Sequence, residues 1–475
     1  MTSAPKAGRL VAGVDCSTQA TKVVVVDADT ATVVASGRST HEVRSAGRAS
    51  ETDPNVWWDA LRDALAQTGV ARDIASLSVA GQQHGMVVLG TDMRPLRPAV
   101  LWNDTRSAEQ ATALVRSFGA RWWAEEVGSV PVAAFTVTSW AWLRATEPEV
   151  AAMTRAVRLP HDWLTQRLCG EAVTDRGDAS GTGWWSVPHG VYHRTVLDHE
   201  LVEIPNSWLP EVLTPSAVAG TVTPAAADEV GLSPGVLVGP GTGDNMAAAL
   251  GLALEPGVAV LSLGTSGTAY AVTGAPAADA SGMVAGFADS TGRYLPLACT
   301  LNATLAVDRF AAWLGLDRDD IAPDSGGVTV LPFLDGERTP NLPGATGSIF
   351  GLTHATTRQQ VLRAAYEGAV LSLLDALELI DGAGDGAAPL ILIGGGARGA
   401  AWQEVAGRLS GRPLEIPAAA ELVALGAAVQ AAAMLGRQDL QAVARRFGGS
   451  TGVTRSPVAR DDEALERARS VRAGL

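Results

Sequence analysis

The sequence predicts an α/β protein that is built from two domains. The chain has 475 residues, which is too many for a single hydrophobic core. Apolar strand patterns alternate with helical patterns along it, and one strand–turn–strand pattern occurs twice, near residue 10 and near residue 258. The repetition indicates an internal duplication. We therefore expect an N-terminal domain over residues 1–246 and a C-terminal domain over residues 247–475.

The overall charge limits the class of partner. The formal net charge is −14, with 50 acidic and 36 basic residues, whereas a nucleic-acid-binding surface is basic. We therefore expect no nucleic-acid partner. A small nucleotide stays compatible with this charge, because backbone N–H groups alone can bind phosphate.

The cysteine pattern and the apolar runs indicate a cytoplasmic protein. The 3 cysteines (Cys16, Cys169 and Cys299) are far apart and lack the paired spacing of a metal site. Residues 1–9 are polar and do not resemble a signal peptide. The most apolar run, residues 422–435, is short and rich in alanine, which predicts a buried helix rather than a membrane span.

Each half begins with a hairpin whose turn is small and polar. In the first half, residues 10–15 and 21–27 are strands around such a turn, and residues 32–36 form a third strand. In the second half, strands 258–263 and 268–272 flank the turn 264–267. Two such turns can hold a polyphosphate from both sides, or they can be ordinary hairpins.

The first hairpin carries a candidate metal and phosphate site. Asp15 can hold Mg²⁺ through water, while Thr18 and Lys22 meet phosphate oxygens. The alternative is that Asp15 is an edge-strand residue and that Lys22 is solvated.

Polar side chains cluster after two strands of the first half. Residues 54–67 predict an amphipathic helix, and strand 77–80 runs into Gln82, Gln83 and His84 before strand 86–89. Residues 98–101 lead to Trp102 and then to Asn103 and Asp104. These groups suit a polyol, whose hydroxyls both donate and accept hydrogen bonds. A structural histidine and a plain turn are the alternatives. Further on we expect a helix over 148–158, a second helix from 160, and a polar loop over 174–183.

Residues 236–250 predict a strand, a glycine-rich turn and a helix. Gly239, Gly241 and Gly243 permit a sharp bend, and Asp244 follows them directly before a helix over 246–250. A carboxylate at the tip of a strand can act as a general base. The alternative is a helix N-cap, a position that aspartate often occupies.

The second half ends in another strand–glycine–helix pattern. We expect helices over 300–314 and 358–379, loops over 331–340 and 382–386, and a strand over 390–393. Three glycines follow that strand, before a helix from residue 401. They allow backbone contact with a flat or anionic ligand, or simply tight packing. Neither a Walker A motif nor G-x-G-x-x-G is present at this position.

Taken together, these stretches resemble the FGGY carbohydrate kinases. The resemblance is ordered, spans nearly the whole chain, and rests on the following segments: Asp15-x-x-Thr18-x-x-x-Lys22, 81–85, 101–106, 241–245, 261–267, 336–340 and 393–398. It implies an actin-like fold, in which two ribonuclease-H-like domains close over a central cleft. It also implies that ATP, with Mg²⁺, phosphorylates a primary hydroxyl of a ketose. One departure is Ser17, which stands where the family usually has glycine, and another is Gln83, where methionine is also familiar.

The resemblance assigns a role to each motif. Asp244 would be the catalytic base, and Asp15 would hold the metal. The sugar would be held by Gln83, His84, Asn103, Asp104 and Asn245. The phosphates would meet Thr18, Lys22, Gly264 and Thr265, and the adenosine would lie between Gly395 and Gly396. The roles of Asp162, Asp175 and Asp178 are open.

Within the family, the motifs Gly81–Gly85 and Trp102–Asp104 most resemble those of the kinases that act on D-xylulose, so the resemblance implies phosphorylation of D-xylulose at its 5-hydroxyl. Ribulose, gluconate and glycerol are the alternatives within the family. An actin-like ATPase and a sugar sensor without kinase activity are alternatives from other classes. A homodimer is compatible with the sequence.

Overall fold

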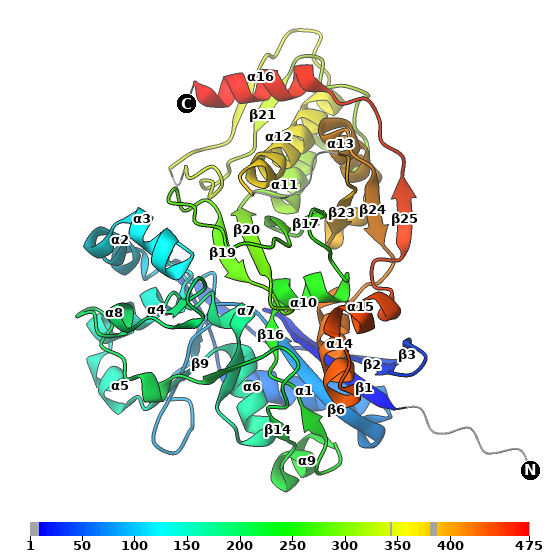
Figure 1. Cartoon of the computed structure of the whole chain (residues 1–475). Helices are drawn as coiled ribbons and strands as arrows, with labels where there is room; N and C mark the ends of the chain where they lie inside the picture. Colours follow the sequence, from blue (N-terminus) through cyan, green and yellow to red (C-terminus); the bar gives the residue numbers. More distant parts are fainter. Residues whose placement is uncertain (1–8, 343, 381–386, 475) are drawn as a thin grey trace, which may run out of the picture.

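Two seven-stranded sheets, one in each of two lobes, organise the structure (Figure 1). The computed structural model describes residues 9–342, 344–380 and 387–474. The predicted loop 382–386 lies outside these residues. Smaller two- and three-stranded sheets and 16 α-helices complete the described part of the chain.

The sheet of the first lobe is built around the predicted N-terminal hairpin. Its path is β14-β15-β6-β1-β2-β3, with β16 paired to β6. Its strands are β1 (Leu10–Cys16), β2 (Ala20–Asp27), β3 (Thr32–Thr40), β6 (Ile74–Gly81), β14 (Gly220–Thr221), β15 (Leu237–Val238) and β16 (Thr242–Gly243). Four successive valines in β2 are buried, which suits a strand covered on both faces.

The sheet of the second lobe repeats this arrangement. Its path is β19-β20-β18-β17-β23-β24-β25. Its strands are β17 (Ala259–Leu263), β18 (Gly267–Ala271), β19 (Ala285–Ala288), β20 (Tyr294–Thr300), β23 (Leu390–Ile393), β24 (Leu414–Pro417) and β25 (Gly452–Arg455). From β20 to β25, successive pairs are antiparallel, antiparallel, parallel, parallel and antiparallel, and the same series runs from β3 to β14. The predicted duplication and the two-domain, ribonuclease-H-like fold are confirmed.

The described residues also form helices, some of which pack on the sheets and others on one another. In the first half of the chain they are α1 (Pro54–Thr68), α2 (Ala108–Phe118), α3 (Ala120–Trp122), α4 (Thr136–Thr146), α5 (Pro148–Met153), α6 (Pro160–Cys169), α7 (Arg176–Ala179), α8 (Arg194–Leu197), α9 (Pro224–Val230) and α10 (Asp244–Gly251). In the second half they are α11 (Thr304–Leu314), α12 (Arg358–Glu378), α13 (Ala400–Ser410), α14 (Leu422–Gly436), α15 (Leu440–Phe447) and α16 (Asp462–Ala473). In the described residues, no helix combines the length and the apolar character that a membrane crossing requires.

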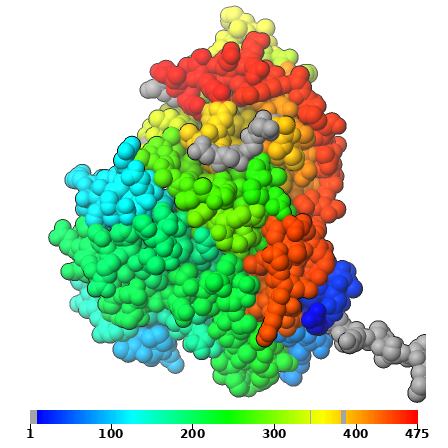
Figure 2. All heavy atoms as spheres, in the orientation of Figure 1, coloured from blue at the N-terminus to red at the C-terminus, as the bar shows by residue number. Residues whose placement is uncertain are grey.

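Helix α14 returns from the second half of the chain to the first sheet. In Figure 2 its orange-red atoms lie beside the blue N-terminal strands. A Cβ at Gly13 would lie 1.8 Å from the carbonyl oxygen of Ala424, so glycine is required for this approach. Ser76 Oγ also donates to the carbonyl oxygen of Ala431 at 3.0 Å. The buried-helix prediction for residues 422–435 is confirmed. The domain division at residue 246 stays a prediction, and a cut there would remove this helix from the first sheet.

Three predicted segments differ from the structure. The helix expected over 148–158 ends at Met153, because residues 156–158 form β9 (Ala156–Arg158) and pair with β7 (Val87–Leu89). The helix expected over 300–314 begins only at Thr304, since residues up to Thr300 belong to β20. The polar loop over 174–183 contains the end of β10 (Val173–Asp175) and helix α7. In the first two cases a partner strand decides the local conformation.

Candidate active site

A cavity of about 380 Å³ is lined by side chains of both lobes and receives several of the predicted site residues. The first lobe contributes Gln83, His84 and Trp102, and the turn of the second lobe contributes Gly264, Thr265 and Ser266. Asp244 and Asn245 line it at the start of α10. The structure therefore brings together the predicted base, three predicted sugar residues and one of the two polar turns.

Asp244 is the first residue of α10, and it does not cap the helix. The N-cap is Gly243, and no side-chain hydrogen bond caps the helix. Asp244 Oδ1 accepts instead from the backbone N–H of Asn245 at 2.8 Å and from Asn245 Nδ2 at 3.0 Å. Burial, with the neighbouring carboxylates Asp15 and Asp178, raises the pKa of Asp244 to about 7. This carboxylate therefore has the proton affinity of a general base near neutral pH.

Gln83 and Asn245 are joined directly beside the base. Asn245 Nδ2 donates to Gln83 Oε1 at 2.9 Å as well as to Asp244. Gln83 is 5% exposed, and its Nε2 has no hydrogen-bond partner among the residues that the structure describes. A buried amide donor without a partner is costly, so a ligand hydroxyl is a suitable acceptor for it.

His84 lines the cavity and is held as a neutral ring. Its backbone φ is 67°, and its Nδ1 lies 2.7 Å from the carbonyl oxygen of Gly181. The ring stacks on Phe135 with centroids 4.9 Å apart and lies 5.6 Å from the ring of Phe287. Burial lowers the pKa of His84 to about 4, so the imidazole is neutral at pH 7. Because Nδ1 carries the proton that the carbonyl accepts, Nε2 is an acceptor.

The predicted metal and phosphate residues of the first hairpin lie outside this cavity lining. Asp15 is 3% exposed; its Oδ2 accepts from Lys22 Nζ at 3.2 Å, and its Oδ1 has no hydrogen-bond partner in the described ranges. Lys22 Nζ also lies 2.9 Å from Glu421 Oε2. Thr18 Oγ1 donates to Gln82 Oε1 at 3.3 Å and accepts from Trp102 Nε1 at 3.1 Å. Through Trp102, this hairpin is therefore tied to the wall of the cavity.

The two predicted adenosine glycines differ in their surroundings. Gly396 is buried, and a Cβ there would lie 2.8 Å from Thr304 Cγ2 and 3.0 Å from Leu263 Cβ. Gly395 is exposed, and a Cβ there would meet nothing within 4 Å. Packing against β17 is therefore sufficient to explain why residue 396 is glycine. The backbone of Gly395, at the end of β23, is accessible to a ligand.

Asn103 and Asp104 do not line the cavity. Asn103 is exposed. Asp104 is buried and accepts from the backbone N–H of Ser50 at 2.8 Å and from Arg106 Nη2 at 2.6 Å. Its carboxylate is thus occupied by protein donors, and its predicted contact with sugar stays a prediction.

Several side chains that line the cavity had no role predicted from the sequence. Arg338 lines it, and in the described residues no carboxylate forms an ion pair with this guanidinium. The apolar wall includes Phe135 and Phe287, which come from segments 152 positions apart in sequence (287 − 135). The only available signal was the position of Arg338 in the loop 336–340, since scattered phenylalanines give none.

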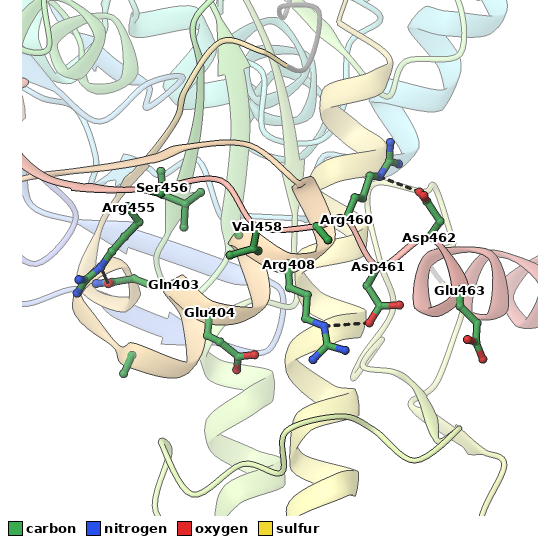
Figure 3. Close-up of a pocket in the computed structure, with 14 residues that line it drawn as sticks. Gln403, Glu404, Arg408, Arg455, Ser456, Val458, Arg460, Asp461, Asp462 and Glu463 are labelled. Carbon is green, nitrogen blue, oxygen red and sulfur yellow. Dashed lines mark hydrogen bonds and ion pairs between the residues drawn. The ribbon is translucent and has the colours of Figure 1, made fainter.

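A second and larger hollow, of about 880 Å³, lies between α13 and the segment 455–463 (Figure 3). Two pairs of its charged side chains are bound to each other: Arg408 to Asp461 at 3.1 Å and Arg460 to Asp462 at 3.2 Å. None of the predicted site residues lines it. Despite its size, it is therefore not the candidate active site.

Comparison with known proteins defines the class. Residues 10–251 match the N-terminal domain of the FGGY family of carbohydrate kinases, and residues 259–435 match its C-terminal domain. The chain belongs to the FGGY family of carbohydrate kinases, and ATP is accordingly a substrate.

Individual relatives are similar over nearly the whole chain. The xylulose kinase of Streptomyces rubiginosus is 58% identical over 463 residues, which cover 97% of this chain and 95% of that protein. The xylulose kinase of Haemophilus influenzae is 34% identical and covers 92% of each chain. The crystal structure of xylulose kinase from Bifidobacterium adolescentis superposes with a TM-score of 0.84 at 37% identity, covering 98% of this chain and 99% of that one.

Proposed function

We propose that the chain transfers the γ-phosphoryl group of ATP to the 5-hydroxyl of D-xylulose and so produces D-xylulose 5-phosphate. The observation that best supports this proposal is a carboxylate with a pKa of about 7 at a cavity that both lobes line. The relatives described above are named for the same sugar.

Asp244 is proposed as the base. The terminal hydroxyl of the sugar gives its proton to Asp244 while its oxygen attacks the γ-phosphorus, and the β-phosphate oxygen leaves with the bond electrons as ADP. The main contribution of the protein is then positioning and charge stabilisation. Asn245 supports this role, because its two donors on Oδ1 fix the orientation of the carboxylate.

Gln83 and His84 are proposed to bind the sugar hydroxyls. The free Nε2 of Gln83 is a donor, and Nε2 of neutral His84 is an acceptor. The pair therefore matches a polyol. Asn103 and Asp104 contribute indirectly in this proposal, because neither lines the cavity.

Asp15 is proposed to hold Mg²⁺. Its buried Oδ1 without a partner is a hard oxygen ligand of the kind that this ion prefers, and one carboxylate together with substrate phosphates is a usual binding arrangement. The ion would neutralise charge on the phosphates. Thr18, Lys22, Gly264, Thr265 and the open backbone of Gly395 stay the proposed contacts to the nucleotide.

Arg338 is proposed as the cation that faces the transferred phosphoryl group. It lines the cavity, and its positive charge lowers the pKa of His84 as a secondary influence after burial. A guanidinium without a carboxylate partner is suited to a phosphate.

The proposed setting is the cytoplasm, which suits a chain whose 3 cysteines are all unpaired. Assembly as a homodimer stays a prediction, and light scattering would measure it.

The direct test is release of ADP from ATP and Mg²⁺ with D-xylulose, compared with D-ribulose, L-ribulose, gluconate and glycerol. We expect strong stimulation by D-xylulose alone. Stimulation by another polyol would support kinase activity but identify a different substrate. Release of ADP that is independent of any sugar would favour an ATPase, and no release with any sugar would favour a sensor.

A further inference from the structure

Four ionisable side chains are buried together near the turn that carries Asp244. They are His161 (0% exposed) and Asp162 (1%) on α6, Asp175 (0%) at the end of β10, and Asp178 (0%) on α7. Buried charges are unfavourable unless they are paired, so a group of three carboxylates needs a cation. The proposed reaction uses none of these four residues directly.

His161 is the cation of this cluster. Its Nε2 lies 3.2 Å from Asp162 Oδ1, 3.2 Å from Asp178 Oδ2 and 3.8 Å from Asp175 Oδ1. Burial alone would lower the pKa of His161, but the carboxylates outweigh burial and raise it to about 9. In the described ranges the carboxylate of Asp178 meets no donor other than this imidazole. His161 therefore compensates a carboxylate that nothing else holds.

The cluster is connected to the proposed base. Thr242 lies two positions before Asp244, and its Oγ1 donates to Asp175 Oδ2 at 2.8 Å. The His161 ring lies directly against the same turn, since a Cβ at Gly241 would be 2.4 Å from its Nδ1. Both ends of this contact are buried, so the ring and the turn cannot move independently.

The cluster is also connected to the proposed sugar site. Asp175 is the N-cap of α7 and accepts from the backbone N–H groups of Gly177 and Asp178. The chain leaves α7 and reaches Gly181, whose carbonyl oxygen accepts from His84 Nδ1. The segment 175–181 thus contacts the turn before the base at one end and the sugar-binding imidazole at the other.

We propose that His161 is a positioning residue for phosphoryl transfer: its buried positive charge fixes Asp175 and Asp178, and through them the segment 175–181 that orients both Asp244 and His84. This inference rests on the proposed function, in which Asp244 is the base.

The charged neighbours of His161 define a pH dependence. Asp162, Asp175 and Asp178 face it from α6, β10 and α7, and Arg158 on β9 acts on Asp162. Asp244 lies beyond them and is influenced by Asp178. When His161 loses its proton at high pH, the three carboxylates lose their adjacent cation. We therefore expect turnover to fall on the alkaline side, near pH 9.

The test compares His161→Gln, which removes the charge, with His161→Lys, which keeps it. We measure kcat and both KM values from pH 6 to 10.5, with thermal unfolding as a check of folding. His161→Gln should lower kcat about 10- to 100-fold and raise the KM for sugar, with little change in the KM for ATP, because small displacements of reacting groups have effects of this size. His161→Lys should restore most of kcat and move the alkaline fall above pH 9.

A second pair avoids any change in buried charge. Thr242→Val removes the hydrogen bond to Asp175, and Thr242→Ser keeps it. We expect about a 10-fold lower kcat for Thr242→Val and near-normal turnover for Thr242→Ser. This pair decides the outcome even if neither His161 variant folds.

Several results would overturn the inference. They are a wild-type kcat and pH profile in His161→Gln, an unchanged alkaline fall in folded His161→Lys, or equal turnover of the two Thr242 variants. Failure of the proposed function is distinguishable, since the wild-type protein would then show no release of ADP that depends on sugar.

Discussion

Replacing Asp244 by asparagine separates the two roles that an aspartate at the start of a helix can play. A general base is needed for turnover, whereas a capping carboxylate is needed for stability. The structure predicts that asparagine lowers turnover but raises stability. Asp244 makes no capping hydrogen bond, and its ionised carboxylate is buried.

The effect on turnover follows from the pKa of the base. With a pKa of about 7 in the free enzyme, the wild-type protein at pH 6 should retain about one tenth of its plateau kcat/KM, because only the ionised form accepts the proton. Asp244→Asn should lower kcat by about 10²- to 10⁴-fold and abolish this acid limb. The KM for sugar should change little, since asparagine keeps the shape of the side chain.

The effect on stability has the opposite sign. The pKa of Asp244 rises from 3.8 in the unfolded chain to about 7 in the fold, so the native state binds this proton more tightly. The associated stability is present below pH 3.8 and is lost as the pH rises through 7. The shift corresponds to about 4 kcal/mol. At pH 8, Asp244→Asn should therefore raise the free energy of unfolding.

The assay is coupled ADP release from pH 5.5 to 9, together with urea unfolding of both proteins at pH 8. Asn245→Asp is not a suitable control, because it adds a second carboxylate; Asp228→Asn, on the exposed side of α9, is the matched control and should change neither quantity. Loss of stability with retained turnover in Asp244→Asn would refute the base assignment and restore the capping interpretation.

Four further predictions follow from the same geometry. His84→Ala should raise the KM for sugar about 3- to 10-fold with an unchanged KM for ATP, because one neutral hydrogen bond is removed; steady-state kinetics with each substrate varied would detect a different pattern. Arg338→Ala should lower kcat about 100-fold and Arg338→Lys less, as expected for charge stabilisation of the transferred group; equal activity of both variants and the wild type would exclude this contact. A chelator should abolish turnover, and added Mg²⁺ should restore it, with ADP release as the readout. The pKa of His161 rises from 6.5 to about 9, so its contribution of about 3 kcal/mol to stability is complete below pH 6.5 and is lost as the pH rises through 9; urea unfolding at pH 6.5 and 9.5 should show this decline in the wild type and a smaller one in His161→Lys.

The sequence by itself predicted the duplicated fold and pointed to Asp244 as the proposed base. The two hairpins are visible without any contact, because apolar strands on either side of a small polar turn are typical of a β-hairpin. The Gly239–Asp244 turn was equally visible, because glycines between a short strand and a helix mark a sharp turn that other residues rarely adopt. The buried helix α14 followed from its composition, although not its location on the first sheet.

Only the tertiary structure decided which polar residues meet. Asp104 follows an apolar strand just as His84 follows another, yet the first is bound by Arg106 and the second lines the cavity. Residues 156–158 carry a helical pattern but pair with β7, because a distant strand edge supplies their hydrogen bonds. The cluster of His161 with Asp162, Asp175 and Asp178 could not be predicted from the sequence for the same reason. Their charges acquire shifted pKa values only when three separate elements bury them against one another, and a linear pattern does not contain that burial.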